Sequence, residues 1–124
     1  MARMGLVLFL LIWISACETT PVKKYSNLPE PLPLTEGQLV YEESGCVHCH
    51  GIQGDGEGFL SVGMVPRPTD FSNGNVMLLR SDSALTKAIR LGMPGTAMPS
   101  YRNFTDRQVR AVVGYLRSFA IVRE

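Results

Sequence analysis

The feature that most constrains this chain is the pentapeptide Cys-Val-His-Cys-His at residues 46–50. A Cys-x-x-Cys-His pattern is typical of a site where haem is attached covalently. Two thiols three residues apart can form thioethers to the two vinyl groups of one haem, and the next histidine can then supply an axial imidazole to the iron. The pattern predicts one haem c held by Cys46, Cys49 and His50. His48 is expected to point away from the iron.

Two other uses of such cysteines are a zinc site and a redox dithiol. A structural zinc site usually has four Cys or His ligands, and no Cys or His follows His50 in the sequence. A thioredoxin-like dithiol belongs in a βαβ context, and the chain shows no alternation of strand and helix patterns. Both uses are therefore disfavoured.

The chain has 124 residues, which fits one small domain. A core of this size is marginal on its own. An attached haem would add a large buried apolar body, much as a metal or a disulfide stabilises other small folds. We therefore expect the chain without haem to be poorly folded.

Residues 1–16 are expected to be a bacterial lipoprotein signal peptide. Arg3 supplies a positive charge, and residues 5–14 form an apolar run too short to span a bilayer comfortably. The segment 14–17, Ile-Ser-Ala-Cys, is similar to the lipobox of bacterial lipoproteins, which implies that Cys17 becomes the lipidated first residue of the mature protein. An ordinary cleaved signal and a retained signal anchor are the alternatives. All three place the haem domain outside the cytoplasm. The lipidated form is expected on the periplasmic side of the cell envelope, anchored to the inner or the outer membrane.

Residues 17–34 are expected to tether the domain to that lipid. They contain four prolines and few apolar residues. A proline-rich linker extends by about 3.1 Å per residue, which gives a reach on the order of 50 Å. The haem domain, residues 35–124, could then move between partners at the membrane, although a bound and ordered linker is also compatible with the sequence.

Within residues 35–124 the patterns predict helices only, and hence an all-α fold. Thr35 and Gln38 fit a capping box for a helix that ends near Glu43 or Ser44. Gly37 in that helix would be tolerated where another helix approaches closely. Residues 76–79 form a possible short helical turn.

Two further helices are predicted in the second half of the chain. Asp82 or Ser83 can cap a helix over residues 84–91, which Gly92 would end. Thr105 and Gln108 fit a capping box for the last and most periodic helix. Its apolar residues recur at the spacing of one helix face, and its arginines are expected to face solvent. The apolar residues are Val109, Val112, Val113 and Leu116, and the arginines are Arg107, Arg110 and Arg117.

With these features the chain resembles the class I monohaem cytochromes c over residues 35–119. The resemblance rests on a helix leading into the Cys-x-x-Cys-His motif, a Met-Pro loop and a C-terminal helix carrying Tyr115. It implies a small fold in which the first and last helices cross around one covalently bound haem. The residues expected at the crossing are Gly37 and Tyr41 on the first helix and Val112, Tyr115 and Leu116 on the last.

The resemblance also implies a sixth iron ligand from the methionine loop before the last helix. Two methionines, each followed by proline, compete for this role, Met93 and Met98. Met98 matches the family's loop better, because Tyr101 stands two residues beyond its proline. Met93 directly follows Gly92 and is expected to be a packing residue. Met64 and Met77 are weaker candidates.

Other haem contacts follow from the same resemblance. In the family a proline carbonyl accepts the Nδ1–H of the proximal histidine, and here either Pro66 or Pro68 could do so, with Pro66 favoured. Pro66, Arg67 and Tyr101 are expected to contact the haem. Arg67 and Arg80 are candidates to meet its propionates.

Charge is distributed unevenly along the mature chain. Residues 17–60 carry two basic and seven acidic side chains, a net charge of −5, whereas residues 61–124 carry nine basic and four acidic ones, a net charge of +5. Such a dipole could orient docking on a redox partner and make the rate depend on salt. Helices with solvated faces are the simpler explanation.

The function predicted from the sequence is one-electron transfer, with His50 and Met98 as the two axial ligands. Two strong protein ligands leave no open site for a substrate, so the chain is expected to be a carrier, or the haem subunit of a larger oxidoreductase complex, and not itself an enzyme. Its partners would be a redox donor and acceptor and the membrane, with no nucleic acid. The alternatives are a haem enzyme or gas sensor with a labile sixth ligand, and a lipoprotein with a non-haem thiol site.

Overall fold

The structure is a computed structural model, and it describes residues 34–120. The predicted signal peptide, Cys17 and almost all of the tether lie outside the described residues. None of the helices within residues 34–120 combines the length and the apolar character that crossing a bilayer requires.

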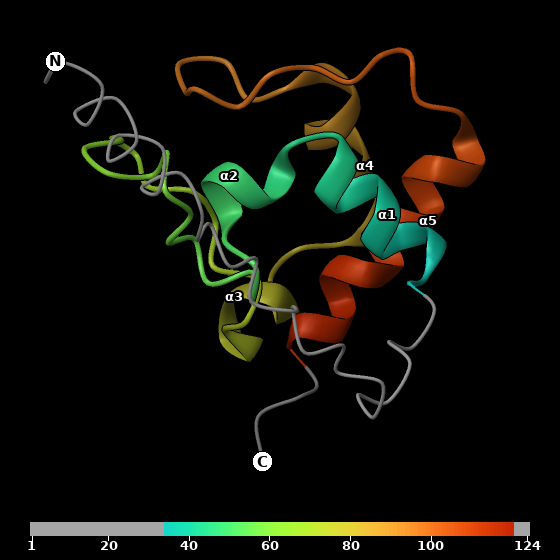
Figure 1. Ribbon diagram of the computed structural model, residues 1–124, viewed down its shortest axis with the longest axis horizontal. Coiled ribbons are helices and arrows are strands. Elements are labelled where there is room, and N and C mark those ends of the chain that lie inside the picture. Colours follow the sequence, from blue (N-terminus) through green and yellow to red (C-terminus); the bar gives the residue numbers. More distant parts are fainter. Residues whose placement is uncertain (1–33, 121–124) are drawn as a thin grey trace, which may run out of the picture. The chain divides into compact units, whose positions relative to one another are not determined.

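Five helices make up the part of the chain that the structure describes, and no strand occurs in it (Figure 1). They are α1 (Glu36–Glu43), α2 (Cys46–His50), α3 (Gly74–Leu78), α4 (Asp82–Leu91) and α5 (Asp106–Phe119). The predicted all-α fold is confirmed. The short turn expected at residues 76–79 overlaps α3, which ends at Leu78 with Leu79 as its C-cap. The helix begins earlier, where the side chain of Asn73 accepts hydrogen bonds from two backbone amides.

The first and last helices cross, as predicted. A Cβ at Gly37 would lie 2.2 Å from the carbonyl oxygen of Ala111 in α5, so only glycine fits at this close approach. One turn later Tyr41, 1% exposed, packs edge-on against Tyr115 with ring centroids 5.5 Å apart. Val112 is also buried at the contact.

The helix caps agree with the sequence in part. Thr105 and Gln108 form the complete capping box expected for α5. At α1 only half of the box forms. The Thr35 hydroxyl accepts from the amide of Gln38, but the side chain of Gln38 does not accept from the amide of Thr35, and its Nε2 donates to Glu42. The N-cap of α4 is Ser81, which accepts from the amide of Ala84 at 3.1 Å, and neither Asp82 nor Ser83.

Arg117 corrects the prediction that the arginines of the last helix face solvent. Its side chain is only 31% exposed, and it donates hydrogen bonds to backbone carbonyls at the end of α3 and to Asp82. Arg107 and Arg110 are exposed, as predicted. Periodicity places Arg117 beside the apolar stripe, but it does not show which neighbours meet that edge of the helix.

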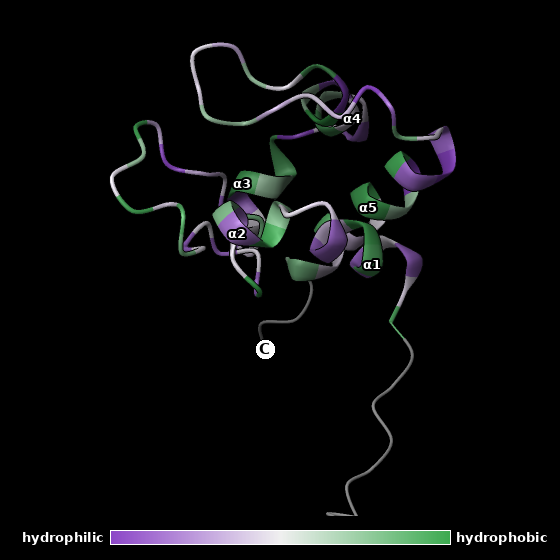
Figure 2. Cartoon of the chain, turned by 45° about the horizontal axis from the view of Figure 1, so that its top comes forward, coloured by the Kyte–Doolittle hydropathy of each residue, from purple (hydrophilic) through white to green (hydrophobic). Residues whose placement is uncertain are grey.

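The glycine-rich segment after α2 folds back onto that helix. The amides of Gly56, Gly58 and Leu60 donate to three successive carbonyls of α2, at 2.9–3.1 Å. A Cβ at Gly58 would lie 2.2 Å from the carbonyl oxygen of His48, so glycine is required there. Beyond it the loop extends from the helices as a largely hydrophobic segment, with Val62 and Val65 85% and 92% exposed (Figure 2).

Candidate haem site

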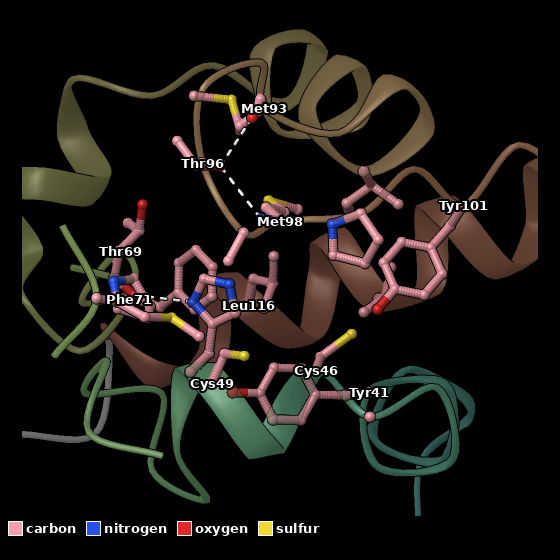
Figure 3. Close-up of a pocket in the computed structure, with 18 of the residues that line it drawn as sticks. Tyr41, Cys46, Cys49, Thr69, Phe71, Met93, Thr96, Met98, Tyr101 and Leu116 are labelled. Atoms are coloured by element: carbon pink, nitrogen blue, oxygen red, sulfur yellow. Dashed lines mark hydrogen bonds between the residues drawn. The ribbon is translucent and has the colours of Figure 1, made fainter. Parts of the chain in front are cut away.

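A largely apolar pocket lies between the helices and two loops, residues 64–71 and 93–101. Cys46, Cys49 and His50 line it from α2. The cysteines are not joined by a disulfide, and both side chains point toward the pocket in Figure 3. Among residues 34–120 no group of three or more His, Cys, Asp or Glu side chains is arranged to hold a metal ion. The pocket therefore presents two thiols and one imidazole from a single short helix.

His50 is held with one ring nitrogen available. Its Nδ1 lies 3.1 Å from the carbonyl oxygen of Thr69. Since a carbonyl only accepts, Nδ1 carries the proton and Nε2 keeps its lone pair. Burial lowers the pKa of His50, and the hydrogen bond to Thr69 opposes this effect only in part. The lowered pKa favours the neutral imidazole. A neutral imidazole with a fixed tautomer is the form that ligates a metal.

The acceptor of this hydrogen bond corrects the expectation that Pro66 or Pro68 would serve. Both prolines line the pocket. The carbonyl of Pro68 faces Gly56, where an added Cβ would lie 2.7 Å from its oxygen. The carbonyl of Thr69, one residue later, is the one that meets His50. No side-chain pattern could have revealed this, because the acceptor is a backbone oxygen.

Phe71 is a second contact of His50 that sequence reasoning missed. The two rings stack with centroids 4.6 Å apart and planes inclined by 26°. Phe71 is 5% exposed, and its amide donates to the carbonyl of Gly54 at 2.6 Å. The residues on either side of Phe71 are hydrogen-bonded to each other, because the carboxylate of Asp70 accepts from the amide of Ser72 at 2.9 Å. The signal available in the sequence was a lone aromatic residue between polar ones.

Across the pocket from the cysteines, the loop before α5 presents Met98 (Figure 3). The loop is closed by three hydrogen bonds. The amide of Met93 donates to the carbonyl of Met98 at 3.3 Å, the Thr96 hydroxyl donates to the carbonyl of Met93 at 2.8 Å, and the amide of Met98 donates to that hydroxyl at 3.2 Å. These bonds hold both methionines at the pocket.

The two methionines differ in their surroundings. Met98 is half-buried and packs against the hydrophobic core, whereas Met93 is 42% exposed. In Figure 3 Met98 lies nearer the cysteines, and Met93 lies higher on the loop. Met64 also lines the pocket, while Met77 belongs to the buried core. The geometry thus places Met98 better than Met93 to face a group bound at α2.

Tyr101 lies beside the first cysteine. Its hydroxyl donates to the carbonyl of Ser44 at 3.2 Å, just before α2. Burial, together with the nearby Cys46 thiol, raises the pKa of Tyr101 to about 12, and burial raises the pKa of Cys46. Tyr101 therefore stays a neutral hydrogen-bond donor that links the methionine loop to the cysteine helix.

The charges in the pocket lining match a haem, which carries two propionate groups. Apart from the pair of thiols and His50, the ionisable side chains of the lining are tyrosines and two arginines, Arg67 and Arg80, with no Asp or Glu. Arg67 is exposed and lies 3.6 Å from Glu57. The Nε of Arg80 is buried and has no hydrogen-bond partner among residues 34–120. An apolar cavity with two cations and no carboxylate fits a large apolar group that brings its own acids.

Comparison with known proteins decides the family. The family model for cytochrome c matches residues 34–120. This chain belongs to the cytochrome c family. The match implies a covalently bound haem c and a role in electron transfer, and Cys46, Cys49 and His50 fit the attachment motif.

Two other proteins are similar to this chain over part of their length. Cytochrome c oxidase subunit 2 of Alkalihalophilus pseudofirmus is 30% identical over 93 residues, which cover 70% of this chain and 26% of the relative. A chain of the reducing HAO-like protein complex of Kuenenia stuttgartiensis is 30% identical with a TM-score of 0.59, covering 78% of this chain and 49% of that one. The chain thus spans about a quarter and about half of these relatives.

Proposed function

We propose that this cytochrome c carries one electron at a time on a haem whose iron is ligated by His50 and Met98. When bound, the haem supplies an iron that alternates between the ferric and ferrous states. The single observation that carries the proposal is that two potential ligands, His50 on α2 and Met98 on the closed loop, line the same pocket. Two strong ligands would leave no open site for a substrate.

Each ligand is held by its own hydrogen-bonded support. The Thr69 carbonyl and the ring of Phe71 fix the plane of His50. The Thr96 hydroxyl ties the two ends of the methionine loop together. A thioether and an imidazole together would stabilise the reduced iron and raise its potential. The two supports would hold both side chains in place in either oxidation state of the iron.

The largely apolar lining of the pocket would shield part of a bound haem from water. Its walls include the core side chains Ile89, Val112 and Leu116 together with Phe71 and Phe104. A low dielectric around the iron would strengthen the electrostatic interactions of every charged group in the site. Arg80, whose Nε is buried without a hydrogen-bond partner among residues 34–120, would be affected most.

The partners and the location form the finer part of the proposal. The export signal and lipobox support a lipid anchor at Cys17, with the domain on the periplasmic side of the envelope. The similar proteins belong, by their names, to an oxidase and to a protein complex, which supports redox proteins as donor and acceptor. The exposed apolar loop hydrogen-bonded to α2 offers a contact surface close to the attachment site.

The ligand assignment is tested with two matched variants, Met98→Ala and Met93→Ala, made as holoprotein with haem-maturation machinery. Met98→Ala should lose the methionine–iron charge-transfer band of the ferric protein, whereas Met93→Ala should keep it. Loss of the band in Met93→Ala with retention in Met98→Ala would exchange the two roles. The anchor is tested by Cys17→Ser, which should release the protein from the membrane fraction.

A further inference from the structure

Arg80 is a half-buried cation whose Nε is buried without an acceptor. It stands between the C-cap of α3 at Leu79 and the N-cap of α4 at Ser81, and it lines the pocket. Its Nε is buried and has no hydrogen-bond partner within residues 34–120. Leaving such a donor unsatisfied costs free energy, and buried polar groups almost always have partners. The geometry therefore calls for an acceptor that enters with the pocket's ligand.

The backbone of Arg80 is held by another arginine, Arg117 on α5. One nitrogen of its guanidinium donates to the carbonyl of Met77 at 2.7 Å, and another donates to the carbonyl of Arg80. Its Nε donates to the carboxylate of Asp82 at 2.9 Å. A single side chain thus binds the last turn of α3, the link at Arg80 and the first turn of α4.

This contact requires the shape of an arginine. The guanidinium is planar and offers five donors in a fixed fork, whereas a lysine offers three donors on one small ammonium group. Arg117 does not line the pocket, so it acts on the pocket only through the segment it holds. The other charged residue of the lining, Arg67, is 72% exposed and has Glu57 beside it. Of the two pocket arginines, Arg80 is therefore the one with a buried, unpartnered Nε and a backbone held by another side chain.

We propose that Arg80 binds a carboxylate of the haem, a propionate, and that Arg117 is the positioning residue that presents Arg80 to it. This inference rests on the proposed function. A carboxylate near the iron favours the ferric state, and a cation that pairs with it offsets this effect. Both arginines should therefore raise the reduction potential, Arg80 by direct pairing and Arg117 through the position of Arg80.

The test is potentiometric titration of holoprotein variants. Arg80→Gln should lower the midpoint potential while the ligand spectrum stays unchanged. Arg117→Gln should also lower it, by more than the control Arg110→Gln, which removes a charge from an exposed position of the same helix. Because the two arginines act in sequence, Arg117→Gln should have a smaller effect in the Arg80→Gln background than alone.

Arg117→Lys keeps the positive charge at residue 117 but removes the guanidinium fork. It therefore separates the effect of that charge on the potential from the role of Arg117 in holding Arg80. It cannot bridge the three acceptors, so we expect a potential below that of the unmodified protein and above that of Arg117→Gln. A potential equal to that of the unmodified protein in Arg80→Gln would overturn the carboxylate site. An unshifted Arg117→Lys, or an equal effect of Arg117→Gln in both backgrounds, would overturn the positioning role. Failure of the His/Met assignment would instead appear as the absence of the methionine–iron charge-transfer band from the spectrum of the unmodified protein.

Discussion

The two sides of the haem pocket are built in different ways. On the helical side, buried side chains of α1, α4 and α5 pack directly against one another, with Tyr41 and Val112 each 1% exposed. On the loop side, residues 64–71 and 93–99 are largely half-buried or exposed, and backbone and hydroxyl hydrogen bonds hold them. Side-chain packing thus supplies stability on one side, while hydrogen bonds position the ligands on the other. Substitutions on the two sides should therefore change different measurements.

The largest effect on stability is expected at the helix crossing. In Gly37→Ala the new Cβ would lie 2.2 Å from the Ala111 carbonyl oxygen, so the helices must separate. We expect a loss of about 3 kcal/mol in the free energy of unfolding, measured by urea denaturation of the holoprotein, with little change in the ligand spectrum. Gly114→Ala is the control, because nothing lies within 4 Å of its Cβ. That variant should gain about 0.5–1 kcal/mol, and equal losses in both variants would contradict the close approach.

The hydrogen bond between α1 and the end of α2 comes next. The Tyr41 hydroxyl donates to the carbonyl of Gly51, directly after the proximal histidine, at 2.7 Å, and burial raises the pKa of Tyr41. Tyr41→Phe leaves that carbonyl without its donor and should cost about 1–2 kcal/mol, again by urea denaturation. Tyr115→Phe is the control, since the structure gives its hydroxyl no hydrogen bond among residues 34–120. It should change stability by less than about 0.5 kcal/mol.

A substitution on the loop side should change the ligand geometry more than the stability. Phe71→Leu keeps an apolar side chain and should cost less than about 1.5 kcal/mol. It removes the ring stacked on His50, so the imidazole plane should turn or become mobile. Electron paramagnetic resonance of the ferric protein should report this as altered g values. Phe104→Leu, which changes a pocket residue packed on Tyr101, should leave them unchanged, and identical spectra for both variants would contradict the role of Phe71.

The smallest effect is expected at the surface of the crossing. The Nε of Arg107 lies 2.8 Å from a carboxylate oxygen of Glu36, with side chains 79% and 39% exposed. Exposed ion pairs contribute little, so Arg107→Gln should change the unfolding free energy by about 0.5 kcal/mol or less. A double-mutant cycle with Glu36→Gln would measure the coupling, which should vanish at high salt. A coupling that persists at high salt would mean that this pair is structural.

The helical side was predicted well from the sequence, because the spacing and type of the residues show which side chains share a buried helix face. The apolar spacing in the last helix matches its buried residues Val109, Val112, Val113 and Leu116. Gly37 was expected at a close approach, and it lies at one. These features depend on which side chains share a face of a helix, and that follows from residue order alone.

The loop side was predicted only in outline. The motif and the Met-Pro loop placed the right segments at the pocket, but the acceptor for His50 is the Thr69 carbonyl and not a proline. Backbone direction after two closely spaced prolines is not encoded in a side-chain pattern. The roles of Phe71 and Arg117 were missed for a related reason, because each contacts a segment far from it in sequence.

We propose a closed haem site with one ligand from α2, His50, and one from the methionine loop, Met98. The most direct test is the optical spectrum of the unmodified holoprotein in the ferric and ferrous states, with and without carbon monoxide. We predict a methionine–iron charge-transfer band in the ferric state and no change when carbon monoxide is added to the ferrous state. Ready binding of carbon monoxide would contradict the claim, because it requires an open or labile sixth position, and a haem enzyme or gas sensor would then be the better description.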